Sequence, residues 1–124
     1  MKLNCQYAEA SEAGDYFQVI FQARKDNEEN DDDDDDIEYL LIQRQFEFPT
    51  KYDCHIETKG YDYIGDFKID KAILTYNSFT LKIQRKEKTE INIIFKVPRK
   101  TYNEIKRVLK IIIPQLTVNE KKIH

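Results

Sequence analysis

The change of hydrophobic period between residues 79 and 112 constrains this chain more than any other feature. Apolar side chains occupy every second position in two segments, residues 79–83 and 91–97, and a period of two places one face of each segment on a core. The polar stretch 86–88 between them is short enough for an antiparallel hairpin. Apolar residues then recur at the intervals of an amphipathic helix, at Tyr102, Ile105, Leu109 and Ile112.

Local signals predict where this helix begins and ends. Thr101 with Glu104 fits a capping box, in which each side chain bonds the backbone N–H of the other residue. Pro114 is expected to end the helix because proline lacks an N–H donor and clashes with the preceding turn. Residues 115–124 are then expected to form a tail. The C-terminal part of the chain is therefore interpreted as a sheet followed by one helix that packs on it.

Strand-like segments also occur upstream, at residues 2–8, 16–23, 37–44, 52–58 and 67–76. Residues 10–15 read as a turn-rich break, whereas the nearly continuous apolar run 39–42 favours a central strand with both faces covered. These patterns predict an α+β fold with about six or seven mostly antiparallel strands and one C-terminal amphipathic helix. Seven strands followed by a helix also fit a pleckstrin-homology-like barrel, which is the alternative architecture.

The length of 124 residues fits a single domain spanning 1–124, which is long enough to bury a core without disulfide or metal staples. The first ten residues lack the apolar run of a signal peptide. No segment approaches the roughly 20 apolar residues of a membrane-spanning helix. We therefore expect a cytoplasmic protein that has no membrane partner.

A cluster of acidic residues separates the charges of the chain. Residues 26–38 hold ten carboxylates and no base, and the other 13 acids stand against 20 Lys and Arg, so the rest of the chain carries a formal charge near +7. Six consecutive aspartates repel one another and have poor helix and strand propensity, so residues 25–36 are expected to be an acidic mobile loop. Calcium is an alternative ligand, but the run lacks the glycine and the ligand spacing of an EF-hand. A third interpretation is an electrostatic arm for a basic partner.

Catalytic signatures are missing from the sequence. It contains no glycine-rich phosphate loop, H-E-x-x-H, G-x-S-x-G or G-x-G-x-x-G motif. Cys54 and His55 are neighbours on an expected strand, so their side chains point to opposite faces and cannot pair as nucleophile and base. Cys5 and Cys54 are expected to be reduced thiols that pack as small hydrophobes. A disulfide between them could form only if their strands are neighbours. We expect a protein that is not an enzyme and has no cofactor and no metal site.

Two surface features remain as binding candidates. The segment 59–66 combines two glycines with tyrosines, and it is either a binding loop or an ordinary turn covered by its own aromatic rings. The helix carries basic residues that can contact phosphates, although exposed lysines are also ordinary solubilising groups. These basic residues are Arg99, Lys100, Lys106, Arg107 and Lys110. We expect no nucleic-acid partner, because the acidic loop would compete for the same patch.

The order of these features resembles a family of bacterial polymorphic-toxin immunity proteins, which are small α+β proteins. The resemblance spans roughly residues 16–113. It is carried by the strand Tyr-Leu-Leu-Ile-Gln-Arg at 39–44, the Gly-Tyr-Asp-Tyr-Ile-Gly loop at 60–65, the strands at 72–74, 79–83 and 91–95, and the terminal helix. The resemblance implies a non-enzymatic inhibitor that binds and neutralises a cognate secreted toxin.

Physical chemistry adds candidate contacts to this resemblance. An acidic loop speeds association with a basic toxin by steering, and tyrosine-rich loops make good interface anchors. The expected partner-binding residues are Asp31, Asp32, Asp33, Asp34, Asp35, Asp36, Tyr61 and Tyr63. The alternative functions are a ligand- or peptide-binding module of pleckstrin-homology-like architecture and, after it, a small enzyme.

Overall fold

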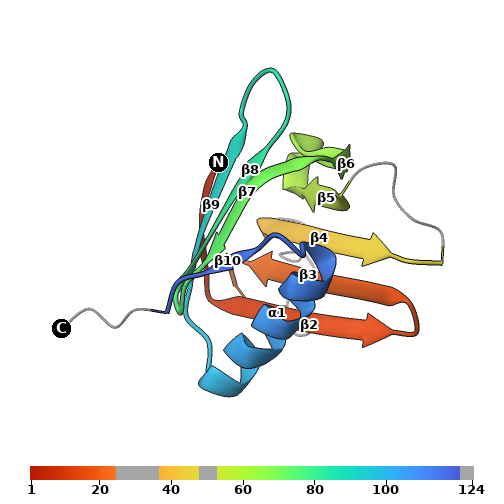
Figure 1. The fold of residues 1–124 in the computed structure, drawn as a ribbon. Helices are drawn as coiled ribbons and strands as arrows, with labels where there is room; N and C mark the ends of the chain where they lie inside the picture. The colour runs from red at the N-terminus through yellow and green to blue at the C-terminus, as the bar shows by residue number, and fades with distance from the viewer. Residues whose placement is uncertain (25–36, 48–52, 121–124) are drawn as a thin grey trace.

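Two five-stranded sheets and one helix make up the fold (Figure 1). The structure, a computed structural model, describes residues 1–24, 37–47 and 53–120. Sheet I contains, in spatial order, β1 (Lys2–Cys5), β9 (Glu90–Phe95), β8 (Ser78–Ile83), β7 (Ile69–Leu74) and β10 (Thr117–Val118). Sheet II contains β2 (Tyr7–Ala13), β3 (Tyr16–Gln22), β4 (Tyr39–Gln45), β5 (Cys54–Thr58) and β6 (Ile64–Phe67). The helix α1 (Arg99–Ile112) is C-terminal. The α+β class predicted from the sequence is confirmed.

Most neighbouring strands are antiparallel, as expected, with parallel pairing only between β1 and β9 and between β10 and β7 among the described strands. The described residues form ten strands, more than the six or seven expected. The predicted break at 10–15 is mostly strand, because β2 continues to Ala13 and turns at Gly14, whose φ is +62°. The segment 59–66, which was predicted as a loop or turn, contains the start of β6, and the predicted tail 115–124 contains β10. Pairing with a neighbour therefore overrides weak local propensity at these three places.

Single residues connect the two sheets at two corners. Gln6 separates β1 from β2, and Lys68 separates β6 from β7, so the chain changes sheet within one residue at each corner. The strands of one sheet consequently run across those of the other (Figure 1). The two sheets remain separate layers in the described residues, so the closed barrel that was the alternative architecture is not formed.

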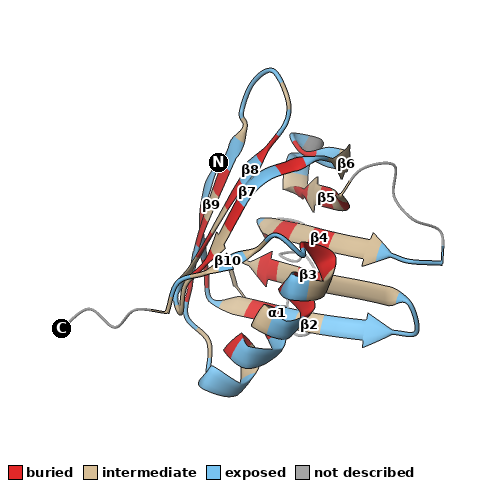
Figure 2. Cartoon of the chain, viewed as in Figure 1, coloured by how far each residue is buried: buried red, intermediate tan, exposed pale blue. Residues whose placement is uncertain are grey.

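The core lies between the two sheets and α1 (Figure 2). Phe21 of sheet II contacts two rings of sheet I, with centroid distances of 5.7 Å to Phe79 and 5.4 Å to Phe95. The predicted helical stripe is confirmed, because Tyr102, Ile105, Leu109 and Ile112 are all buried. The helix packs against β2, β3 and β4. One face of sheet II is therefore covered by sheet I and the helix together.

The ends of α1 differ in part from the sequence prediction. The predicted capping box is wrong: Pro98 is the N-cap, and no side chain caps the helix. Glu104 instead accepts a hydrogen bond of 2.9 Å from Arg107 one turn along. The helix ends at Ile112, ahead of Pro114 as expected. Arg44 of β4 donates a 3.1 Å hydrogen bond to the Ile112 carbonyl, where the helix would otherwise leave a C-terminal carbonyl unsatisfied.

Candidate partner-binding surface

Among the described residues, the central strand of sheet II is covered on one face only. β4 occupies the middle of the sheet, as its apolar run predicted. Its inward residues Leu40 and Ile42 are fully buried, whereas Leu41 between them is only half-buried. The prediction that both faces are covered is therefore wrong. No described element packs over the outward face, since α1 and sheet I both lie on the inward side.

Residues of sheet II that point away from the core form the outward face. Strand geometry turns alternate side chains to opposite faces, and the buried partners fix which set is outward. Ile20 lies opposite Leu41, Leu41 opposite Glu57, and Glu57 opposite Ile64, so a mostly apolar row crosses four strands, with Glu57 between Leu41 and Ile64. The aromatic and aliphatic residues of the outward face are Tyr7, Tyr16, Ile20, Tyr39, Leu41 and Ile64.

Hydrogen bonds hold the tyrosines of the outward face in place. The Tyr39 hydroxyl of β4 donates a 2.8 Å hydrogen bond to Glu57 Oε2 of the neighbouring strand β5. The Tyr16 hydroxyl lies 2.5 Å from Gln43 Oε1 and also contacts Gln18. A ring that is already fixed loses little conformational entropy when a partner covers it. The outward face is therefore a partly apolar surface with preorganised aromatic groups.

The charge of the outward face is negative. The five strands of sheet II contain a single Lys or Arg, which is Arg44, and its side chain points inward to the end of α1. Glu57 and Asp66 flank His55, with His55 nitrogens 3.9 Å and 3.5 Å from their respective carboxylate oxygens. Glu9 adds a third carboxylate on the edge strand. Such a surface attracts cationic groups.

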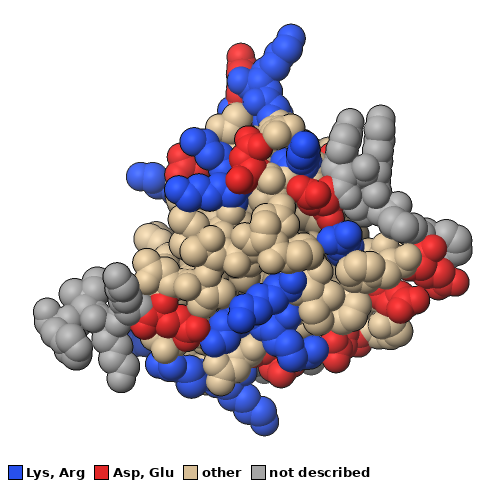
Figure 3. All heavy atoms as spheres, in the orientation of Figure 1, with Lys and Arg blue, Asp and Glu red and all other residues tan. Residues whose placement is uncertain are grey.

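Basic residues gather elsewhere on the molecule. Figure 3 shows lysines and arginines over α1 and around the loop that joins β8 to β9. Two of the helix residues that the sequence singled out are paired: Arg107 with Glu12 and Glu104, and Lys106 with Glu120 at 2.9 Å. The basic residues thus lie among acidic partners on this side of the molecule, whereas Lys and Arg are nearly absent from the strands of sheet II.

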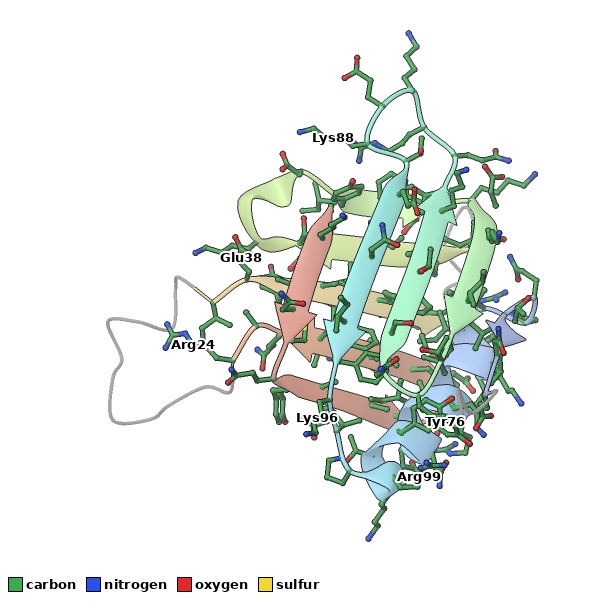
Figure 4. The ribbon with its side chains drawn as sticks, turned by 90° about the vertical axis from the view of Figure 1, so that its left-hand side faces the viewer. Arg24, Glu38, Tyr76, Lys88, Lys96 and Arg99 are labelled. Atoms are coloured by element: carbon green, nitrogen blue, oxygen red, sulfur yellow. The ribbon has the colours of Figure 1, made fainter. Side chains whose placement is uncertain are left out.

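The predicted partner residues Asp31 to Asp36 lie outside the described residues. The described chain stops at Arg24, just after β3, and resumes at Ile37, just before β4 (Figure 4). Since β3 and β4 are neighbours in sheet II, both ends of the acidic segment leave from the same end of the two strands that carry Ile20 and Leu41. The described chain on both sides of the segment therefore belongs to the neighbouring strands β3 and β4.

The two tyrosines predicted as partner contacts have different outcomes. The side chain of Tyr61 lies outside the described part of the structure. Tyr63 is only 2% exposed, and its hydroxyl donates a 2.7 Å hydrogen bond to the Lys88 carbonyl. Its ring packs in the core, so Tyr63 does not present an exposed anchor to a partner and this prediction needs correction.

Both cysteines are free and buried, as expected. Cys54 points into the core while His55 lies on the outward face, which confirms that the two side chains do not face each other. Burial raises the pKa of the Cys54 thiol to about 12, with a smaller contribution from Asp53. Burial likewise raises the pKa of Cys5 to about 12. These thiols stay protonated at neutral pH and are poor nucleophiles.

Two further findings, on metal ligands and on membrane-spanning helices, concern all the described residues. No group of three or more His, Cys, Asp or Glu is arranged to hold a metal ion within 1–24, 37–47 and 53–120. Over the same residues, the structure contains no helix with both the length and the apolar character to span a membrane.

Comparison of the chain with protein-family models, characterised proteins and solved structures finds no match.

Sequence reasoning missed the outward face. Leu41 was interpreted as a residue of a strand covered on both faces and Ile64 as a loop residue, because a run of apolar side chains does not say which faces of a strand are covered. The available signal was the near absence of Lys and Arg from five consecutive strands of a chain that holds 20 such residues.

Proposed function

We propose that this protein is a non-enzymatic immunity protein, which binds a cognate secreted bacterial toxin through the outward face of sheet II and neutralises it in the cytoplasm. The observation that carries the proposal is the row of outward side chains Ile20, Leu41 and Ile64, with Glu57 between the last two, over which no described element packs. Contiguous apolar surface rimmed by polar groups is typical of a protein interface.

The composition of the outward face fits a protein partner. Tyrosines are enriched among the residues that dominate binding energy, because a ring and a hydroxyl combine large contact area with a hydrogen bond. Tyr39 lies beside the apolar row, with its hydroxyl held by Glu57. A partner that covers this row would bury Leu41 at the centre together with the Tyr39–Glu57 hydrogen bond, and would leave Glu9 on the edge strand at the rim. That arrangement is the usual anatomy of a specific interface.

Charge specifies the kind of toxin. The outward face has carboxylates and no outward-pointing Lys or Arg in its strands, and the acidic segment is connected to its central pair of strands. A cationic partner gains from both, since opposite potentials speed association and favour one orientation. Toxins that act on nucleic acid have cationic surfaces for their phosphate-bearing substrate. A negatively charged inhibitor can occupy that surface and exclude the substrate.

The test mixes the purified protein with the product of the neighbouring gene and measures the mass of the mixture by size-exclusion chromatography with light scattering. We expect a one-to-one complex, and loss of the toxin's activity at equal molar ratio. Separate elution of the two proteins at micromolar concentration would contradict the proposal. A complex in which the toxin keeps full activity would contradict the inhibitory role.

A further inference from the structure

A cleft lies at the corner of the molecule where the start of β1, the start of β4 and the turn after β5 meet. Its volume is about 560 Å³, which is in the range of small-molecule sites. Glu38 and Lys88 lie on the same side of the molecule in Figure 4. The charged and glycine residues of its lining are Lys2, Glu38, Lys59, Gly60, Asp62 and Lys88.

Hydrogen bonds across the two sheets build the wall of the cleft. The Thr58 N–H donates to the Tyr63 carbonyl at 2.9 Å, which closes the turn after β5. Tyr63 in turn donates from its hydroxyl to Lys88, and Arg85 donates to the Asp62 carbonyl at 3.0 Å. The turn in sheet II and the β8–β9 loop of sheet I are thus fixed against each other. A preformed wall lowers the entropy cost of binding a ligand.

The backbone is unusual at two places in this wall. Lys88 has a φ of +51°, and it is the only non-glycine residue with positive φ among the described residues. This conformation is costly for an L-residue with a side chain, and such strain is concentrated at functional sites. Gly60 has a φ of +80°, and a Cβ there would meet nothing within 4 Å, so its backbone borders open space. A ligand can therefore approach the main chain at Gly60.

Ammonium groups outnumber carboxylates in the cleft. Lys2, Lys59 and Lys88 line it against Glu38 and Asp62. The Lys88 ammonium is 3.8 Å from Asp62, and both side chains are more than half exposed, so this pair is weak and open to competition. Lysine is a common point-charge ligand for phosphate, and carboxylates accept hydrogen bonds from sugar hydroxyls.

We propose that this cleft binds a small organic phosphate that carries hydroxyl groups, such as a sugar phosphate. The three lysines hold the phosphate, and Glu38 and Asp62 accept hydrogen bonds from the hydroxyls. The site adjoins the proposed partner interface at Tyr39, which lines the cleft, and its binding of a ligand does not require the partner.

Isothermal titration calorimetry with ribose 5-phosphate, using the whole chain at low ionic strength, tests this proposal. We expect saturable binding that is at least about tenfold weaker in K59Q/K88Q, because two charge-assisted contacts are lost. The matched control is K100Q/K110Q, which removes the same charge from exposed positions on α1 and is expected to bind like the unmodified protein. Inorganic phosphate should bind more weakly than the sugar phosphate, since it lacks the hydroxyl contacts.

Three results would overturn the proposal. The first is no saturable binding at millimolar ribose 5-phosphate, and the second is an equal loss in both double variants, which would indicate general charge attraction. The third is equal affinity for inorganic phosphate and ribose 5-phosphate. Urea unfolding of each variant checks that the fold is intact. If K59Q/K88Q is unstable, K2Q/K88Q removes the same charge from the same cleft and replaces it in the comparison.

Discussion

The hydroxyl of Tyr63 donates a hydrogen bond of 2.7 Å to the main-chain carbonyl of Lys88. This contact joins the turn before β6 in sheet II to the loop between β8 and β9 in sheet I. The Arg85 guanidinium lies 4.5 Å from the centre of the same ring, within the range of a cation–π contact. A tyrosine that the sequence suggested as a partner contact therefore serves to connect the two sheets.

Removing the Tyr63 hydroxyl is expected to destabilise the protein. Y63F leaves the Lys88 carbonyl without this donor, and the free energy of unfolding should fall by about 1 kcal/mol, the net value of one hydrogen bond. Urea unfolding measures the change. The matched control is Y7F, whose hydroxyl bonds Glu9 at the surface and whose loss should cost less than about 0.5 kcal/mol. Equal stabilities of the two variants would show that the Tyr63–Lys88 contact is not structural.

Phe21 is expected to couple the two sheets during unfolding. Its fully buried ring contacts Phe79 and Phe95 of the other sheet, so F21A should cost about 3–5 kcal/mol. Far-UV circular dichroism and tyrosine fluorescence should report the same urea midpoint, because neither sheet retains a core alone. The control F46A changes a ring that is 41% exposed and should cost about 1 kcal/mol. Separate midpoints for the two probes would contradict a shared core.

The buried thiols are expected to be protected from modification. Cys5 and Cys54 should react with Ellman's reagent at pH 8 at least about 1,000-fold more slowly than in urea, because reaction requires opening against a stability of about 5–15 kcal/mol. Their raised pKa, about 12 for each thiol, further lowers the thiolate fraction. The absorbance change with time measures both rates. A thiol that reacts rapidly in the folded protein would contradict the burial and would favour the enzyme alternative.

The acidic segment is expected to affect how fast the partner binds. Replacing the six aspartates at 31–36 with serine removes six of the ten carboxylates of residues 26–38. The association rate at low salt should fall by about tenfold, with little change in the dissociation rate, because steering acts before contact. Surface plasmon resonance at several salt concentrations measures both rates. An unchanged association rate would exclude a steering role and leave the outward face as the interface.

The periodic segments of the chain predicted the fold correctly. The alternation that ends at Phe95 and the helical stripe that begins at Tyr102 each correspond to an observed element, because a long pattern averages over weak local preferences. The short strands β6 and β10 were missed because each is defined by its pairing, β6 with β5 across a tight turn and β10 with β7, which is distant in sequence. Local propensity carries no information about such partners.

The candidate interface was only partly predictable. The acidic run and the tyrosine content suggested a charged, aromatic surface, but not which tyrosines are exposed. Tyr63 and Tyr39 have similar local sequences, with an acidic residue before and an apolar residue after each. One lies in the core and the other on the outward face, because the register of β4 and the turn after β5 decides the direction of each side chain. Register is a property of the assembled sheet.

The central claim is that the outward face of sheet II binds the toxin, and two matched isoleucines test it directly. Ile64 on this face is 51% exposed, and Ile94 on the outer side of sheet I is 59% exposed. Biolayer interferometry with the toxin, as the product of the neighbouring gene, compares I64K with I94K. We predict that I64K weakens binding at least about tenfold, since it places a cation in the apolar row, and that I94K binds like the unmodified protein. Unchanged binding by I64K, or an equal loss in I94K, would contradict the claim.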